Sequence, residues 1–320
     1  MKHFLITGGA GFIGSHLTEA LLAQGHQVSV IDNFNDYYEP ERKRDNLRGA
    51  LQQEKFRLWE GDICEEAFLQ RVLCSNTYDA VVHLAARAGV GPSLRQPVLY
   101  QQVNIGGTQM VLEGCRQAGV RKVVFASSSS VYGGNREAPF CEEHSVARPI
   151  SPYAATKAAG ELLGYTYSHL YDMQVLCLRF FTVYGPRQRP DMAIHRFALQ
   201  LLNKQAVTLH GDGSMRRDFT YIDDIVAGIQ GALQYEKSKY EVINLGNSRT
   251  VSLVELLQLL ERILGTKAVI QYKPVPPGDM QETYADISKA QRLLQYEPHT
   301  GLEAGLKAFA AWLQAKGVSY

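Results

Sequence analysis

Short apolar segments alternate with segments of helical periodicity through the first half of the chain. The apolar segments, each five residues long, predict β-strands over His3–Thr7, Gln27–Ile31, Phe56–Glu60, Ala80–Leu84, Lys122–Ala126 and Val175–Arg179. Between them, apolar residues recur at helical spacing, for example over Ser15–Gln24 and Val103–Ala118. This alternation predicts an α/β fold, a doubly wound parallel sheet with helices on both faces, to which Glu241–Leu245 adds a candidate seventh strand.

The pattern changes after Arg179, where prolines and glycines separate shorter elements. We therefore expect a sheet domain over residues 1–179 plus about 219–247. A smaller α/β C-terminal domain is expected over about 180–218 and 248–320. Phe219–Gln234 is predicted to be a helical segment that returns to the sheet domain.

Composition narrows the classes of partner. The 320 residues are 45% hydrophobic and 20% charged, with a formal net charge of +1, so no overall field attracts nucleic acid or an anionic membrane. Five scattered cysteines lack metal-ligand spacing and predict reduced thiols, which is typical of a cytoplasmic protein. No signal peptide and no apolar run of about 18 residues is visible, so we expect no membrane as a partner. From the cysteine spacing we expect no metal, and from the net charge no nucleic acid.

A glycine pattern follows the first predicted strand. Gly8, Gly11 and Gly14 lie between that strand and a helix, where the missing side chains let the backbone approach a pyrophosphate. Asp32 ends the second strand, where a carboxylate can bond a ribose diol and would repel a 2′-phosphate. Together these residues predict a dinucleotide site that prefers NAD to NADP. The alternative is that the glycines serve packing and that Asp32 is a turn residue.

A tyrosine and a lysine lie four residues apart at Tyr153 and Lys157. On a helix they lie about 40° apart around the axis and face the same way. The ammonium is expected to lower the pKa of the phenol and so to make a base, and Ser128 could hydrogen-bond the same substrate hydroxyl. The competing interpretation is a flexible turn at Ser128 and a surface pair at Tyr153 and Lys157.

The glycine pattern, Ser128, Tyr153 and Lys157 resemble the extended short-chain dehydrogenase/reductase family of nucleotide-sugar epimerases and dehydratases. The resemblance covers nearly the whole chain and implies an NAD-binding Rossmann domain followed by a nucleotide-sugar-binding domain. It identifies Asp62-Ile63 with an adenine contact. The cofactor site is predicted to comprise Gly8, Gly11, Phe12, Ile13, Gly14, Asp32, Asn33, Asp62, Ile63, Leu84, Ala85, Ala86, Asn104, Ser127, Tyr153 and Lys157.

Two further stretches, residues 32–38 and 179–192, look like those of UDP-glucuronate 4-epimerases. The resemblance implies a UDP-sugar substrate, with UDP-glucuronate favoured. Thr182 with Arg189 or Arg187 would hold its carboxylate, unless these arginines lie on a solvated loop. The substrate site is predicted to comprise Ser128, Ser129, Tyr153, Thr182, Arg187, Arg189, Arg217 and Asp279.

Several activities are compatible with this family pattern. Related dehydratases carry an Asp-Glu pair where this chain has Ser129 and Ser130, and related decarboxylases place a Glu in this run, so both reactions are disfavoured. The chain also departs from its relatives at Arg87, Gly91 and Pro276. A UDP-galactose or UDP-N-acetylglucosamine 4-epimerase stays open, as does a non-catalytic dinucleotide sensor. The family resemblance further suggests a homodimer through helices near residues 100–116 and 153–171.

Overall fold

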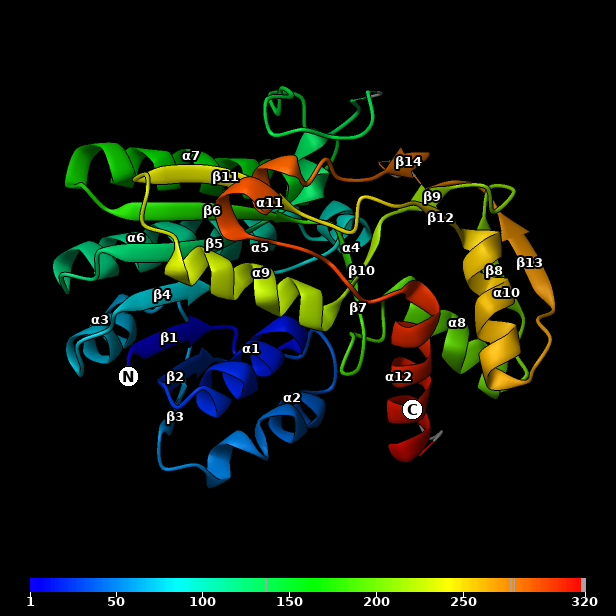
Figure 1. The fold of residues 1–320 in the computed structure, drawn as a ribbon, viewed down its shortest axis with the longest axis horizontal. Helices are drawn as coiled ribbons and strands as arrows, with labels where there is room; N and C mark the ends of the chain where they lie inside the picture. The colour runs from blue at the N-terminus through cyan, green and yellow to red at the C-terminus, as the bar shows by residue number, and fades with distance from the viewer. Residues whose placement is uncertain (136, 277, 279, 318–320) are drawn as a thin grey trace.

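A single parallel sheet forms the centre of the molecule (Figure 1). The computed structural model describes residues 1–135, 137–276, 278 and 280–317. Its seven strands are β1 (His3–Thr7), β2 (Gln27–Asp32), β3 (Phe56–Glu60), β4 (Ala80–His83), β5 (Lys122–Ser128), β6 (Gln174–Phe180) and β11 (Tyr240–Leu245). They lie in the order β11-β6-β5-β4-β1-β2-β3, and all neighbours pair in parallel. The predicted α/β fold and all seven predicted strands are confirmed.

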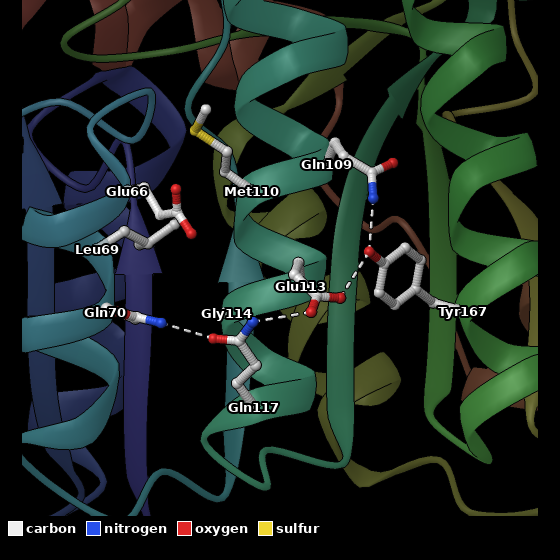
Figure 2. A pocket seen from close by; sticks show the side chains of 9 residues that line it. All are labelled: Glu66, Leu69, Gln70, Gln109, Met110, Glu113, Gly114, Gln117 and Tyr167. Atoms are coloured by element: carbon white, nitrogen blue, oxygen red, sulfur yellow. Dashed lines mark hydrogen bonds between the residues drawn. The ribbon is translucent and has the colours of Figure 1, made fainter.

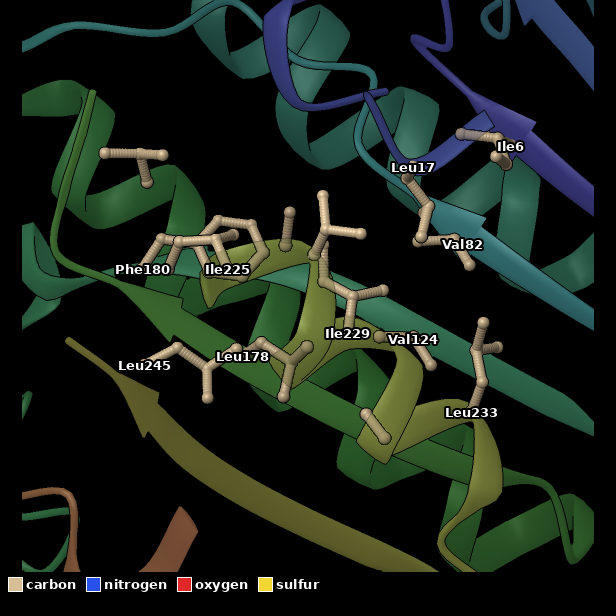
Figure 3. Packing of buried hydrophobic residues seen from close by; sticks show 14 of the residues in the cluster. Ile6, Leu17, Val82, Val124, Leu178, Phe180, Ile225, Ile229, Leu233 and Leu245 are labelled. Atoms are coloured by element: carbon tan, nitrogen blue, oxygen red, sulfur yellow. The ribbon is translucent and has the colours of Figure 1, made fainter. Parts of the chain in front are cut away.

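Helices cover both faces of this sheet. One face carries α1 (Phe12–Ala23), α2 (Pro40–Leu47), α9 (Ile222–Gln234) and α11 (Ser288–Leu294), and the other carries α3 (Glu66–Cys74), α6 (Thr108–Gln117) and α7 (Pro152–Tyr171). Successive strand residues alternate between the faces, so Ile6 packs under α1 and α9 whereas Leu5 packs under the other layer. Figure 3 shows the first of these cores, where Leu17, Ile225 and Ile229 meet strand residues. The inner strands β1, β4, β5 and β6 are buried on both faces, which explains their nearly continuous apolar sequence, whereas the edge strand β3 is partly exposed.

The segment before α6 is less regular than its periodicity predicts. It comprises α4 (Val90–Arg95), α5 (Pro97–Gln101) and a π-helical turn over Gln102–Gly107 that leads directly into α6. The predicted helix over Val103–Ala118 therefore begins inside this turn. Such turns are often found at functional sites, and this one carries the buried side chain of Asn104.

A third hydrophobic core lies beside the sheet. It brings together α8 (Ala193–Leu202), α10 (Leu253–Leu264) and α12 (Leu302–Ala315) with strands β7 (Thr182–Tyr184), β8 (Val207–His210) and β10 (Phe219–Tyr221). Four further short strands complete this region: β9 (Arg216–Arg217), β12 (Val251–Ser252), β13 (Ile270–Lys273) and β14 (Glu282–Thr283). The division into two domains remains a prediction, but α11, placed in the second domain from sequence, packs on the sheet side with Ala290 and Leu294.

The predicted helix over Phe219–Gln234 is wrong in its first three residues. Phe219–Tyr221 forms β10, which pairs in parallel with β7, and the helix begins only at Ile222. Tertiary pairing with a distant strand overrides the local helical pattern here, because Phe219 enters the third core. Within the described residues, no helix is long and apolar enough to cross a membrane.

Asp218, between β9 and β10, bonds the segments that follow β11 and β14. Its side chain is fully buried and accepts hydrogen bonds from the backbone N–H groups of Asn247 (2.7 Å), Ser248 (3.0 Å) and Ala285 (3.1 Å). A fourth bond comes from the Thr220 hydroxyl at 3.0 Å. One carboxylate therefore fixes three separate segments of chain.

Asp218→Asn should lower the free energy of unfolding by at least about 2 kcal/mol, because an amide replaces an acceptor oxygen with a donor that faces other donors. Urea denaturation followed by circular dichroism measures this difference. Asp212→Asn is the matched control, since Asp212 is exposed and accepts locally from Ser214. A change in Asp218→Asn no larger than in the control would contradict this role.

Candidate active site

The predicted cofactor residues converge at the carboxyl ends of β1, β2 and β4. Gly8 has a φ of +70°, and a Cβ there would lie 2.7 Å from the backbone nitrogen of Ala85. A Cβ at Gly14 would lie 2.4 Å from the Gly8 carbonyl oxygen, so helix α1 can begin this close to the loop only without a side chain. The backbone from Gly8 to Gly14 is thus kept open at a helix N-terminus, which is the geometry that a pyrophosphate requires.

Asp32 ends β2 beside this loop. Its Oδ2 accepts from the Ala10 N–H at 3.1 Å and its Oδ1 from the Phe34 N–H at 2.9 Å. Burial raises the pKa of the Asp32 carboxyl, and the nearby Lys43 ammonium opposes that shift. Each oxygen keeps a further lone pair, so the carboxylate is positioned by backbone bonds and can still accept from a diol.

The other side chains predicted for the adenosine end lie next to Asp32. Asn33 donates to the Asp62 carboxylate at 2.7 Å, and Asp62 accepts from the Cys64 N–H at 2.8 Å. Ile63 is buried, and a Cβ at Gly107 would lie 2.7 Å from its Cδ1. The structure therefore brings Asn33, Asp62 and Ile63 together at the same edge of the sheet as the glycine loop. The glycines, Asp32 and these neighbours fit a dinucleotide.

Helix α7 presents Tyr153 and Lys157 toward the end of β5. Its N-cap is Ser151, whose Oγ accepts from the Ala154 N–H at 3.1 Å. Lys157 is buried, donates to the Ala126 carbonyl at 2.6 Å and has its Nζ 6.0 Å from the centroid of the Tyr153 ring. The two side chains share one face of the helix, as their spacing predicts.

The predicted effect of Lys157 on Tyr153 is not found. Burial raises the pKa of Tyr153 above its ordinary value, while hydrogen bonding to Ser128 and the positive charge of Arg189 both act to lower it. Burial likewise lowers the pKa of Lys157 to about 8, against the opposing charge of Glu161. The expectation that the ammonium depresses the pKa of the phenol is therefore wrong for this arrangement, in which burial is the largest influence on both groups.

Asn104 links the cofactor side of the site to helix α7. Its Oδ1 accepts from the Arg87 N–H at 2.8 Å, and its Nδ2 donates to the Arg87 carbonyl at 2.9 Å and to the Thr156 hydroxyl at 3.0 Å. Thr156 in turn donates to the Tyr153 carbonyl at 2.8 Å. Asn104 thus fixes the loop after Leu84-Ala85-Ala86 against the start of α7, through contacts that a sequence pattern does not reveal.

The two candidate arginines of the loop after β7 point to different partners. Arg187 adopts a φ of +65° and donates to Glu19 on α1 at 2.7 Å. Arg189 bonds Asp191 through Nε (2.9 Å) and Nη2 (3.0 Å), and its guanidinium carbon lies 5.5 Å from the centroid of the Tyr37 ring. Of the two arginines, Arg189 is the one whose charge acts to lower the pKa of Tyr153.

Tyr37 is a residue of this site to which sequence reasoning gave no role. Its hydroxyl donates to the Ala88 carbonyl at 2.7 Å and approaches Asp191 Oδ2 at 3.4 Å, while the Tyr100 hydroxyl donates to the same carbonyl at 2.6 Å. The Tyr100 ring also packs edge-on against the Tyr153 ring, with centroids 6.3 Å apart. The available signal was the position of Tyr37 inside the stretch that resembles UDP-glucuronate 4-epimerases.

The remaining predicted substrate residues are distributed around this centre. Ser129 begins the short helical turn after β5, and Thr182 opens β7, where its N–H donates to the Asp218 carbonyl at 3.1 Å. Arg217 lies on β9 and donates to the backbone carbonyls of Arg216 and Gln281. Asp279 lies outside the described residues.

The chain matches a known family over almost its full length. The family model described as GDP-mannose 4,6 dehydratase matches residues 5–309. A UDP-glucuronate 4-epimerase of Thermodesulfobacterium geofontis is 44% identical over 98% of this chain and 96% of that protein.

Solved structures agree with this relationship. The UDP-glucuronic acid 4-epimerase of Bacillus cereus, in complex with UDP-glucuronic acid and NAD, has a TM-score of 0.93 and 39% identity over 98% of this chain and 99% of that one. The UDP-glucose 4-epimerase of Thermotoga maritima with UDP-glucose has a TM-score of 0.90 and 32% identity, over 98% of this chain and 99% of that one. The chain therefore belongs to the extended short-chain dehydrogenase/reductase family of nucleotide-sugar epimerases and dehydratases.

Proposed function

We propose that the protein is an NAD-dependent UDP-sugar 4-epimerase that converts UDP-glucuronate to UDP-galacturonate through a 4-keto intermediate. The observation that carries this proposal is the position of Arg189, whose guanidinium lies by the Tyr37 ring and whose charge acts to lower the pKa of Tyr153. A cation near the base suits a sugar that carries a carboxylate on the carbon next to the reacting one. The relatives named above supply the nucleotide and the cofactor class.

The Gly8–Gly14 loop and Asp32 would hold the cofactor, and NAD supplies a hydride acceptor and donor when it is bound. Tyr153 would take the proton from the C4 hydroxyl and, once the sugar has presented its other face, return it to the C4 oxygen. Ser128, which hydrogen-bonds Tyr153, would bond the same C4 oxygen. Lys157 lies one helical turn away and would bond the cofactor ribose.

The substrate carboxylate needs restraint, because a 4-keto glucuronate has its ketone β to that group and can lose CO₂. We assign the restraint to Arg189 with Thr182. Asp191 occupies the Nε and Nη2 hydrogens of Arg189, so Nη1 stays directed away from that pair and can donate to a carboxylate. A carboxylate held near the plane of the sugar would align its C–C bond poorly with the carbonyl π system, which resists decarboxylation.

The nucleotide end of the substrate is assigned to Arg217 and Asp279, by the family resemblance of their motifs. Arg217 lies on β9, which pairs with β14 and β12. In this assignment the sheet domain binds the cofactor, and the smaller domain binds the nucleotide of the substrate. The serines at 129 and 130 leave no acid–base pair for dehydration.

We also propose a homodimer that works in the cytoplasm. Helix α7 exposes Leu162 (69%), Tyr165 (54%) and Leu170 (60%), which favours a partner surface along this helix. Figure 2 shows the neighbouring groove between α3, α6 and α7, where Tyr167 donates to Glu113 at 3.0 Å. Sedimentation of a monomer at micromolar concentration would contradict the dimer.

The cysteines bear on the cytoplasmic location. All five are free thiols, which agrees with a reducing compartment.

Proton NMR of the protein with UDP-glucuronate should show the anomeric signal of UDP-galacturonate, and the same protein should turn over UDP-glucose far more slowly. The reason is the charge of Arg189, which we assign to the carboxylate at C6 of the sugar. Faster conversion of UDP-glucose or UDP-N-acetylglucosamine would favour a 4-epimerase of neutral sugars. The absence of any product with all three sugars, despite bound NAD, would favour a dinucleotide sensor.

Tyr153→Phe should reduce kcat by about 10²–10⁴-fold, since a general base contributes a factor of this size. Steady-state turnover of UDP-glucuronate measures the loss, and the melting temperature checks the fold. Tyr165→Phe is the matched control, because Tyr165 lies on the same helix but is half exposed. If Tyr153→Phe keeps more than about a tenth of the wild-type rate, another group is the base.

Arg189→Ala should lower kcat/KM for UDP-glucuronate by roughly tenfold to over a hundredfold, because a charge-assisted bond contributes about 1.5–3 kcal/mol. Residual activity on UDP-glucose should fall much less, and the share of decarboxylated pentose product should rise. Arg187→Ala is the control, because its guanidinium is bonded to Glu19. Equal losses on both sugars in Arg189→Ala, with an unchanged product ratio, would refute the carboxylate clamp.

A further inference from the structure

A second buried ionisable side chain lies one helical turn beyond Lys157. Glu161 is 4% exposed, and its carboxylate accepts from Arg179 Nε at 2.9 Å, Arg179 Nη2 at 2.7 Å and Ser127 Oγ at 2.5 Å. No predicted catalytic or substrate-binding role includes Glu161 or Arg179. The bidentate pair with the Arg179 guanidinium and the bond from Ser127 hold this carboxylate in one position.

The donors come from two neighbouring strands. Ser127 on β5 and Arg179 on β6 are directly paired in the parallel register, and both are 3% exposed. The Arg179 guanidinium also lies over the Tyr132 ring, with its carbon 4.7 Å from the centroid. The carboxylate is therefore clamped at the carboxyl edge of the sheet, at the level where helix α7 delivers Lys157.

Burial of Lys157 disfavours a charged ammonium, because the side chain is only 4% exposed. The Phe125 ring, whose centroid lies 5.1 Å from Nζ, favours the cation but carries no full charge. His83 on β4 interacts electrostatically with Lys157, but burial lowers the pKa of His83 to about 3 and keeps it neutral. Tyr153 on the same helix is neutral in its resting form.

Two charged side chains share this buried region with Lys157. Glu161 lies one turn further along α7, and Arg179 of β6 is paired with Glu161. The Ala126 carbonyl gives Lys157 a hydrogen-bond acceptor but no full charge. Glu161 lies one turn further along α7 and bonds Ser127, the residue after Ala126, so it brings a full negative charge to the side of Lys157 and favours the protonated lysine. Moving Glu161 or neutralising it would leave the burial of Lys157 unopposed.

We propose that Glu161, held by Arg179 and Ser127, is a positioning residue that keeps Lys157 protonated beside Tyr153. The proposal deepens the proposed function, on which the catalytic meaning of Lys157 rests. It assigns Arg179 an indirect role, which is to aim and immobilise the carboxylate. Different effects on Lys157 are therefore expected when the two partners are neutralised separately.

Glu161→Gln should lower the midpoint of Lys157 titration by about one pH unit or more, because the charge that opposes burial is lost. Arg179→Met should leave the midpoint unchanged or raise it, since Glu161 stays charged next to Lys157. The midpoint is measured by NMR of protein labelled with ε-¹³C lysine and saturated with NAD, and the Lys157 signal is identified by its absence in Lys157→Met. Glu113→Gln, a change on helix α6, is the control.

The pH profile of kcat gives an independent readout. A lower Lys157 pKa removes the ammonium at lower pH, so the alkaline limb of Glu161→Gln should move down, whereas that of Arg179→Met should not. A merely structural pair would reduce the rate or stability of both variants without moving the limb.

The double variant Glu161→Gln/Arg179→Met removes the buried charges together and guards against misfolding of either single variant. It should also titrate Lys157 at lower pH than the wild type. A wild-type midpoint in the double variant, or a downward shift of equal size in Arg179→Met, would overturn the proposal. The NMR titration needs no turnover, so a failure to convert UDP-glucuronate would refute the proposed function alone.

Discussion

The close docking of helix α7 on β5 and β6 is the constraint on which the rest of the site depends. A Cβ at Gly160 would lie 2.3 Å from the Phe125 ring, and one at Gly164 would lie 2.9 Å from Val175, so only glycine lets the helix lie this close. At this distance the neighbouring side chains of the helix reach the carboxyl edge of the sheet. Lys157 can bond the Ala126 carbonyl and Glu161 can meet Arg179 because of that approach.

The same close packing creates an electrostatic problem. Burial disfavours both charged forms that the proposed chemistry uses, since it raises the pKa of the Tyr153 phenol and lowers that of the Lys157 ammonium. Each group has an opposing charge near it, Arg189 for the phenolate and Glu161 for the ammonium. The pKa values of Tyr153 and Lys157 therefore depend both on their burial and on neighbouring charges, one from the loop after β7 and one from the next turn of α7.

The substrate loop shows how the backbone separates two similar side chains. Arg187 and Arg189 are two residues apart, and the left-handed backbone at Arg187 sends its guanidinium to Glu19 on α1. Arg189 instead bonds Asp191 and lies by the Tyr37 ring. One arginine therefore bonds the loop to the first helix, and the other is the one that we propose binds the carboxylate of an acidic sugar.

The sequence by itself determined the strands, the glycine loop and the helical pair, because these depend on periodicity and on spacings within one element. It also pointed to Asp32 and Ser128, since the end of a parallel strand is a local property. Tertiary structure alone decided the partner of each arginine, the strand at Phe219–Tyr221 and the packing of α11 on the sheet. It also decided the pKa of Tyr153 and the clamp on Glu161, because burial and charge at these groups come from residues far away in the sequence.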